Sequence, residues 1–315
     1  MRAERVLITG AGGFLGSHIA HYFGSLGHTV APVGRFAATQ ASALSYPNLW
    51  KLCGMTLPDE AFRTIVSAFR PTLMVHCAGT ASVADSVQQP YLDFQKTVEV
   101  CAFALETMRT LAPSCRVVLL SSASVYGNPA ALPIEEGAPL RPVSSYGYHK
   151  MLSETLAEEY RVLHGMKVAV IRIFSAYGER LRRQVVHDIC HKFANPAAET
   201  IELFGTGNES RDFIHALDVA RGIDCIHRND AVGTFNVASG VQTSISDLTG
   251  IIGGLFANAK PVVFTGEIRQ GDPLNWQASI DSIASLGFRQ GLGLEAGLAR
   301  YIAWYKTAGN NEVTL

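Results

Sequence analysis

The sequence predicts an α/β protein in which a doubly wound parallel sheet is followed by a smaller C-terminal α+β domain. Three observations indicate this fold. In the first half of the 315 residues, short apolar and β-branched runs alternate with amphipathic helical segments, which is typical of a parallel sheet covered on both faces. The first run, residues 6–9, leads directly into a cluster of glycines at 10–16. Beyond residue 174 the alternation ends and fewer strands are indicated.

The glycine cluster has the order strand, tight turn, helix. Gly10 can form the turn, Gly13 lets a ligand approach the backbone, and Gly16 lets the helix pack on the strand. Backbone N–H groups and the positive end of a helix dipole then meet at one point, which suits a pyrophosphate. The alternative is a strand–helix corner that binds no ligand. We expect a dinucleotide-binding turn made by Gly10, Gly12, Gly13, Phe14, Leu15 and Gly16.

The second strand, residues 28–33, ends at Gly34 and Arg35. In a dinucleotide-binding fold, an acidic residue at this point binds the adenosine ribose and repels a 2′-phosphate. Here the acid is missing, Gly34 leaves space, and the Arg35 guanidinium can pair with phosphate. NADP is therefore the expected cofactor. The alternative is NAD, with Arg35 as a solvated surface residue.

The rest of the first half supplies further strands and helices in order. A strand at 73–77 ends at Ala78 and Gly79, whose small size would admit the cofactor to the strand end. The other expected elements are a weak strand at 49–53, a helix at 61–69, a long helical stretch after Pro90, a strand at 116–120, a helix at 151–163 and a strand at 168–173.

Composition and charge exclude several classes of function. A net charge of -1 with interleaved charges indicates neither a nucleic-acid surface nor a polybasic membrane segment. No apolar run approaches the ~20 residues of a membrane span, and the first strand begins soon after Met1, so we expect a cytoplasmic protein without a signal peptide. Six scattered cysteines favour free, buried thiols. His187 and His191 flank Cys190, but further ligands are not apparent and no metal site is expected.

Candidate catalytic residues follow the fifth strand. Tyr146 and Lys150 are four residues apart at the start of a helix, and hence on one face. A lysine cation near a phenol favours the phenolate, and Ser122 at a strand end could bond the same substrate oxygen. Alone, the Tyr–Lys spacing is a frequent accident of helix composition. After a glycine turn and a serine-bearing strand end, it predicts alcohol oxidation or carbonyl reduction with a bound hydride acceptor.

Seven segments in one order carry a resemblance over nearly the whole chain. They are TGAGGFLG at 9–16, HCAG at 76–79, SSASVYG at 121–127, YGYHK at 146–150, RIFSAYG at 172–178, RDFIH at 211–215 and RQGDP at 269–273. With these segments the chain resembles the extended short-chain dehydrogenase/reductase family, in particular its nucleotide-sugar epimerases, reductases and dehydratases. The resemblance implies a Rossmann-type sheet of about seven strands in residues 1–173, with 216–240 returning to it, and a substrate domain in 174–215 and 241–315.

The resemblance also implies roles for single residues. Tyr146 would be the acid and base, Lys150 would assist it and bind the nicotinamide ribose, and Ser122 would bond the substrate oxygen. Arg211 and Arg269 would grip the diphosphate of a nucleotide-diphosphate sugar, because a guanidinium pairs with phosphate in a bidentate manner; a surface salt bridge is the alternative for each. The implied substrate-binding set is Ser122, Ser124, Ser175, Arg211 and Arg269.

The chain departs from the family pattern at several positions. Ala123 and Ser124 stand where the 4,6-dehydratases carry an Asp–Glu pair, so elimination of water would lack its acid and base. Ser175 replaces a common Asn and Glu179 a common Pro, which leaves the nearby substrate contacts open. The acid expected at Gly34 is missing, and the Asp that contacts adenine has no clear counterpart around residues 55–56.

Three functions are therefore weighed. The first is reduction of a 4-keto nucleotide sugar by NADPH, which Arg35 slightly favours over the second, a 4-epimerase with tightly bound NAD. The third is a non-catalytic dinucleotide sensor, which would predict loss of Tyr146 or Lys150, and both are present.

A homodimer is also expected, because relatives of this type pair two helices across a two-fold axis. We place Met151, Leu152, Leu105 and Met108 in its interface; the alternative is that they serve the monomer core.

Overall fold

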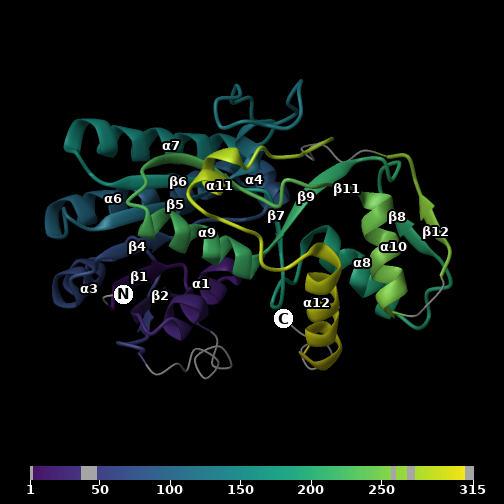
Figure 1. The fold of residues 1–315 in the computed structure, drawn as a ribbon, viewed down its shortest axis with the longest axis horizontal. Helices are drawn as coiled ribbons and strands as arrows, with labels where there is room; N and C mark the ends of the chain where they lie inside the picture. Colours follow the sequence, from purple (N-terminus) through teal and green to yellow (C-terminus); the bar gives the residue numbers. More distant parts are fainter. Residues whose placement is uncertain (1–2, 37–47, 257–259, 268–273, 309–315) are drawn as a thin grey trace.

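The computed structural model describes residues 3–36, 48–256, 260–267 and 274–308, and its centre is a seven-stranded sheet (Figure 1). All neighbouring strands in this sheet are parallel, in the order β10-β6-β5-β4-β1-β2-β3. This confirms the predicted doubly wound sheet. The strands are β1 (Arg5–Thr9), β2 (Thr29–Gly34), β3 (Cys53–Gly54), β4 (Leu73–His76), β5 (Arg116–Ser122), β6 (Val168–Ile173) and β10 (Gly233–Val237).

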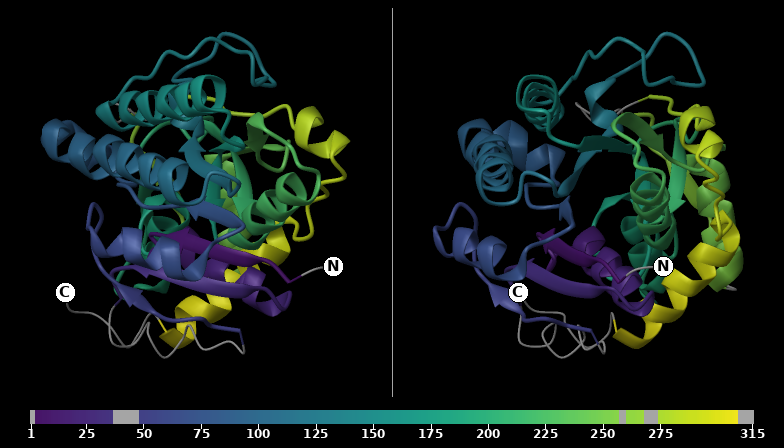
Figure 2. Two further views of the ribbon diagram at one scale, coloured as in Figure 1. Left: turned by 90° about the vertical axis from the view of Figure 1, so that its left-hand side faces the viewer. Right: turned by 60° about the vertical axis from the view of Figure 1, so that its left-hand side comes forward.

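Helices cover both faces of the sheet (Figures 1 and 2). Successive residues of a strand point to opposite faces, so Val6 and Ile8 of β1 join one core and Leu7 joins the other. The first core is closed by α1 (Phe14–Ser25), α9 (Ala216–Arg228) and α11 (Asp281–Ser285). The second is closed by α3 (Ala61–Phe69), α6 (Val100–Leu111) and α7 (Ser145–His164). Both faces are thus apolar, as in a buried parallel sheet.

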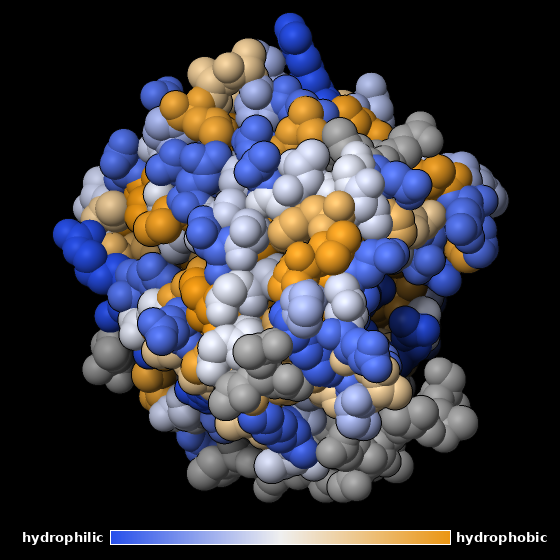
Figure 3. All heavy atoms as spheres, turned by 90° about the vertical axis from the view of Figure 1, so that its right-hand side faces the viewer, coloured by the Kyte–Doolittle hydropathy of each residue, from blue (hydrophilic) through white to orange (hydrophobic). Residues whose placement is uncertain are grey.

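A smaller lobe lies to the right in Figure 1. Its core is built from two small sheets and three helices. The face of this lobe drawn in Figure 3 carries hydrophobic side chains in small groups separated by hydrophilic ones. Its elements are β7 (Ser175–Tyr177), β9 (Ser210–His215) and β11 (Gln242–Ser244) in one sheet, β8 (Ile201–Leu203) and β12 (Val262–Phe264) in the other, and α8 (Gln184–Ala194), α10 (Ile245–Phe256) and α12 (Leu294–Ala308).

Several elements differ from the expected ones. The stretch around Pro90 is divided into α4 (Val83–Gln88), α5 (Pro90–Phe94), a π-helical turn (Gln95–Glu99) and α6. Helix α7 begins six residues before the expected start because Ser144 caps it, with its hydroxyl accepting from Gly147 N at 3.2 Å. The weak strand at 49–53 is reduced to β3 and one bridge to β2. No helix of the described segments is long and apolar enough to cross a membrane.

The dimer interface expected from the sequence is wrong in part. Leu105 and Met108 are 1% and 0% exposed, because the face of α6 that carries them packs on the sheet. They belong to the monomer core and are not available to a second subunit. Leu152 is 41% exposed and remains available.

A buried ion pair joins α7 to the sheet. Arg172 of β6 donates from Nη2 to Glu154 Oε2 at 2.8 Å and from Nε at 3.1 Å. The Arg172 Nη1 atom bonds Tyr126 Oη at 2.9 Å and Glu136 O at 2.8 Å. Arg172 and Glu154 are each less than a tenth exposed. Because the guanidinium is held on several sides, this pair fixes α7 against β6 and the loop at 126–136.

Removal of the Glu154 carboxylate should therefore destabilise the fold. Glu154→Ala leaves a buried guanidinium without its anion, and we expect the free energy of unfolding in urea to fall by about 3–5 kcal/mol. Glu158→Ala is the matched control on the same helix, because its pair with Arg161 lies at the surface; the urea midpoint should stay unchanged. Equal midpoints for the two variants would contradict this expectation.

Candidate active site

The glycine turn after β1 has the geometry of an anion site. Gly13 caps α1 without any side-chain acceptor, so the N–H groups of the first helical turn remain available to a ligand. A Cβ atom on Gly16 would lie 2.3 Å from Gly10 O, so the helix packs on the turn only with glycine there. Gly10 has a φ of 66°, and a Cβ atom on it would lie 2.7 Å from Ala78 N. The turn therefore meets the end of β4, and its residues fit a pyrophosphate.

The end of β2 lies directly against this turn. A Cβ atom on Gly34 would be 3.1 Å from Ala11 N and 3.2 Å from Gly12 N, and one on Gly12 would be 1.8 Å from Arg35 O. The space expected beside Gly34 from the sequence is therefore smaller than predicted, because the backbone of the glycine turn occupies part of it. The Arg35 side chain is exposed.

Lys150 lies beneath the loop that follows β4. Its ammonium is buried and donates to Leu120 O at 3.0 Å, and a Cβ atom on Gly79 would lie 3.8 Å from Lys150 Nζ. An ammonium has three donors, so this cation has further donors for a ligand above Gly79. Burial, with the Lys150 charge nearby, lowers the pKa of His76 to about 3, so this neighbouring ring is neutral.

The first turn of α7 places Tyr146 beside the end of β5. Lys150 Nζ is 5.8 Å from the centre of the Tyr146 ring. A Cβ atom on Gly147 would lie 2.7 Å from Ser124 O, so the helix approaches residues 122–124 as closely as glycine permits. The Ser122 hydroxyl accepts from Ser124 N at 3.2 Å. The Ser124 hydroxyl is buried and has no hydrogen-bond partner within the described part of the chain, which is the situation of a group that awaits a ligand.

The smaller lobe supplies the other expected substrate residues. Ser175 is half-buried on β7, which pairs with β9 so that Ser175 stands opposite Phe213. Arg211, two positions earlier on β9, donates from Nη1 to Ser210 O at 2.9 Å and Leu274 O at 3.3 Å. Its guanidinium lies 5.8 Å from the centre of the Trp276 ring. Arg269 lies outside the described residues.

Glu179 is held by side chains from both lobes. Its carboxylate pairs with Arg300, with His215 Nε2 at 3.2 Å and with His18 Nε2 at 3.6 Å. Burial opposes ionisation of Glu179, but hydrogen bonds from these side chains outweigh it and hold the carboxyl pKa well below its usual range. The residue therefore bridges α1, β9 and α12, and joins the two lobes.

The histidines expected to bind no metal are engaged elsewhere. His187 and His191 contact the hydroxyls of Tyr301 and Tyr305 at 3.0 Å and 3.1 Å. Burial raises the pKa of the Cys190 thiol between them to about 12. The described segments contain no cluster of metal-ligating side chains.

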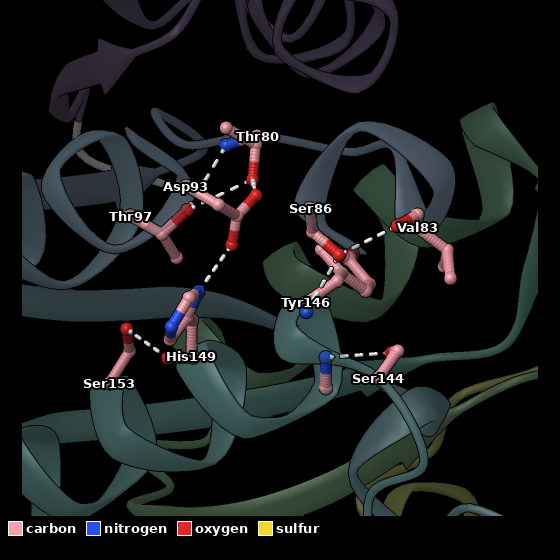
Figure 4. Close-up of polar contacts among 10 residues, drawn as sticks. Thr80, Val83, Ser86, Asp93, Thr97, Ser144, Tyr146, His149 and Ser153 are labelled. Atoms are coloured by element: carbon pink, nitrogen blue, oxygen red, sulfur yellow. Dashed lines mark hydrogen bonds and ion pairs between the residues drawn. The ribbon is translucent and has the colours of Figure 1, made fainter. Parts of the chain in front are cut away.

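Sequence reasoning missed one polar cluster beside the site, in which Asp93, His149, Thr80 and Thr97 bond to one another (Figure 4). His149 lies next to Lys150 within the YGYHK segment, so the sequence did offer a signal for this residue. Asp93 stands in a helical stretch with no pattern of its own, and only the tertiary structure brings it to His149.

The family model named NAD dependent epimerase/dehydratase family matches residues 6–238. The chain belongs to this family. The matched region includes the glycine turn, Ser122 and the Tyr146–Lys150 pair. Members of this family are enzymes of the extended short-chain dehydrogenase/reductase type. This finding is against the interpretation of the chain as a non-catalytic dinucleotide sensor.

Two family members that resemble this chain over nearly its whole length are named as UDP-glucose 4-epimerases. A putative UDP-glucose 4-epimerase from Methanocaldococcus jannaschii is 27% identical, covering 96% of this chain and 98% of the relative. A UDP-glucose 4-epimerase from Mycolicibacterium smegmatis is 29% identical, with the same two coverages. These names favour epimerisation over the 4-keto reduction preferred from the sequence.

Solved structures of the family resemble the fold closely. MoeE5 in complex with UDP-glucuronic acid and NAD has a TM-score of 0.84 at 26% identity, covering 96% of this chain and 99% of the other. The UDP-glucose 4-epimerase of Thermus thermophilus in complex with NAD has a TM-score of 0.83 at 25% identity, with the same coverages. Both proteins bind NAD, and neither structure supports NADP in particular.

Proposed function

We propose that this protein is an NAD-dependent 4-epimerase of a nucleotide-diphosphate sugar. The observation that carries the proposal is the buried Lys150 ammonium beneath Gly79, on the same helix face as Tyr146 and beside residues 122–124. The names of the family members that match nearly the whole chain, and the NAD in similar structures, support the same function.

The proposed chemistry uses residues at the start of α7 and at the end of β5. NAD, when bound, would take a hydride from carbon 4 of the sugar and return it to the other face. Tyr146 would accept the proton of the 4-hydroxyl group and give it back. Lys150, fixed by Leu120 O, would hold its remaining donors toward the cofactor ribose. The Ser122 and Ser124 hydroxyls would orient the sugar oxygen.

The two lobes would share the ligands. Residues 1–173 with 216–240 would hold the dinucleotide, because the glycine turn and the β4 loop meet at the carboxyl ends of the strands, next to the point where strand order reverses. Residues 174–215 and 241–315 would hold the nucleotide-diphosphate sugar, with Arg211 and Arg269 facing the diphosphate. Ala123 and Ser124 offer no acid–base pair for a dehydratase.

One observation favours a second candidate, the 4-keto reductase. Position 34 has no acid to repel a 2′-phosphate, and the exposed Arg35 side chain stands next to it. This arrangement suits NADP. The site at Tyr146 and Lys150 serves either reaction, so the cofactor distinguishes them.

We also propose a homodimer, formed through the outer face of α4, α5 and the start of α7. Large apolar side chains are exposed there, which is typical of an interaction surface. They are Val87 (55% exposed), Tyr91 (71%), Leu92 (38%), Tyr148 (51%) and Leu152 (41%).

The catalytic assignment predicts a large loss of turnover in Tyr146→Phe. The ring stays and the transferable proton is removed, so the rate of UDP-glucose to UDP-galactose conversion should fall by at least ~100-fold, with NAD binding retained. Tyr148→Phe is the matched control, because Tyr148 lies two residues away on the same helix and the change keeps its apolar ring, and it should convert at the unaltered rate. Near-normal turnover in Tyr146→Phe would refute the assignment.

The cofactor assignment predicts that the denatured protein releases NAD, identified by chromatography and mass. Arg35→Ala should leave the NAD content unchanged, because an epimerase site needs no cation for a 2′-phosphate. The reductase would replace the epimerase if the unaltered protein were empty, bound NADPH ~10-fold or more tightly than NADH, and lost that preference in Arg35→Ala.

The dimer proposal predicts a two-subunit species in sedimentation velocity at micromolar concentration. Leu152→Glu places a charge in the proposed interface and should give monomers, because burial of an unpaired charge is costly. Val241→Glu, at an exposed residue of the smaller lobe, should leave the dimer intact. A monomeric unaltered protein would rule the dimer out.

A further inference from the structure

Asp93 is a buried carboxylate that the proposed chemistry does not use. It lies on α5 and is 3% exposed. One carboxylate oxygen, Oδ2, is 2.5 Å from His149 Nδ1, and the other accepts from the Thr80 hydroxyl. Both carboxylate oxygens therefore have a hydrogen-bond partner, as buried polar groups usually do. Asp93 therefore joins α5 to the loop after β4 and to α7 (Figure 4).

The hydrogen bonds of this cluster have one consistent direction. His149 Nδ1 faces a carboxylate and so carries the proton. Because the Thr80 hydroxyl donates to Asp93, its oxygen accepts from the Thr97 hydroxyl at 3.0 Å. The Thr97 oxygen in turn accepts from Thr80 N at 3.3 Å. A buried network in which every polar group makes its hydrogen bonds in a single pattern holds the helices and loops that carry those groups in one arrangement.

The cluster lies beside the proposed catalytic lysine and contains none of the proposed reacting groups. His149 precedes Lys150 on α7, and Thr80 follows Gly79 in the loop above the Lys150 ammonium. A Cβ atom on Gly79 would lie 3.7 Å from Thr97 Oγ1 and 3.8 Å from Lys150 Nζ. Asp93 thus connects His149, which precedes Lys150, with Thr80, which follows Gly79.

A second contact holds the same turn of α7 from α4. The Ser86 hydroxyl donates to Val83 O at 2.7 Å and accepts from Tyr146 N at 3.0 Å (Figure 4). Tyr146 is thereby fixed through its backbone, and Lys150 through its neighbour His149. The two contacts approach the first turn of α7 from the same side.

We propose that Asp93 is a positioning residue, which sets the first turn of α7, and with it Tyr146 and Lys150, at its working distance from the cofactor loop at 79–80. This proposal rests on the proposed function for its kinetic consequence. The physical reason is that displacement of a catalytic group by about 1 Å can lower turnover by ~100-fold. Substrate affinity depends on the other lobe and should change little.

The test compares Asp93→Ala with the conservative Asp93→Asn. In Asp93→Ala, kcat for nucleotide-sugar epimerisation should fall by ~10- to 100-fold while KM stays within about threefold. Asp93→Asn should restore kcat to within about threefold, because its oxygen still accepts from Thr80 and its amide donates to the other tautomer of His149. Asp85→Ala, an exposed control on α4, should match the unaltered protein. A kcat in Asp93→Ala that stays within about threefold of the unaltered value would overturn the proposal.

Amide hydrogen exchange supplies a readout that needs no substrate. Asp93→Ala should speed exchange in residues 145–150 by about tenfold or more and leave residues 158–164, at the far end of α7, unchanged. If the unaltered protein does not epimerise nucleotide sugars but Asp93→Ala shows this local effect, the proposed function is refuted and the positioning role stands. Uniform exchange changes along α7 would refute the positioning role. If Asp93→Ala does not fold, Thr80→Val breaks the link between Asp93 and the loop at 79–80 with little change in side-chain size, and the same kcat and KM outcomes decide.

Discussion

The close approach of the glycine turn to the loop after β4 is the constraint on which the rest of the site depends. Only a residue without a side chain fits at Gly10, because Ala78 N and Cys77 O lie within 2.8 Å of the place where a Cβ atom would stand. This contact brings together the ends of two neighbouring strands at the point where the strand order changes direction. Helix α1 begins there without a side-chain cap, so the backbone alone offers a cradle whose geometry fits a phosphate.

Helix α7 brings the proposed catalytic residues to that cradle, and three different interactions hold its first half. Close packing of Gly147 on Ser124 O sets the first turn, the Asp93–His149 contact follows, and the buried Glu154–Arg172 pair fixes the next turn to β6. Of these, the ion pair supplies stability and the first two determine where Tyr146 and Lys150 lie. A side chain on α7 is thus placed by contacts from three separate segments.

In the proposed mechanism, the distinction between epimerase and reductase would not arise at Tyr146, because the same proton transfer would serve both reactions. It arises at the cofactor, and there the chain offers opposing features. Arg35 and the missing acid at position 34 suit a 2′-phosphate, whereas the similar epimerases and the NAD-bound structures point to NAD. The tight packing of Gly34 on the turn removes part of the argument for NADP, because a glycine is needed there for steric reasons whichever cofactor binds.

The sequence by itself determined the parallel sheet, the glycine turn and the Tyr146–Lys150 face, because each is a local pattern: alternation of apolar runs, glycines in a fixed order, and two residues one helical turn apart. Only the tertiary structure decided that Leu105 and Met108 face the sheet, that Glu179 pairs with Arg300 and two histidines, and that Asp93 meets His149. The Asp93–His149 and Glu179–Arg300 contacts join residues 56 and 121 positions apart along the chain. An amphipathic helix shows which face is apolar, but not which neighbour covers it, and the partner of a buried charge is set by the packing of whole elements.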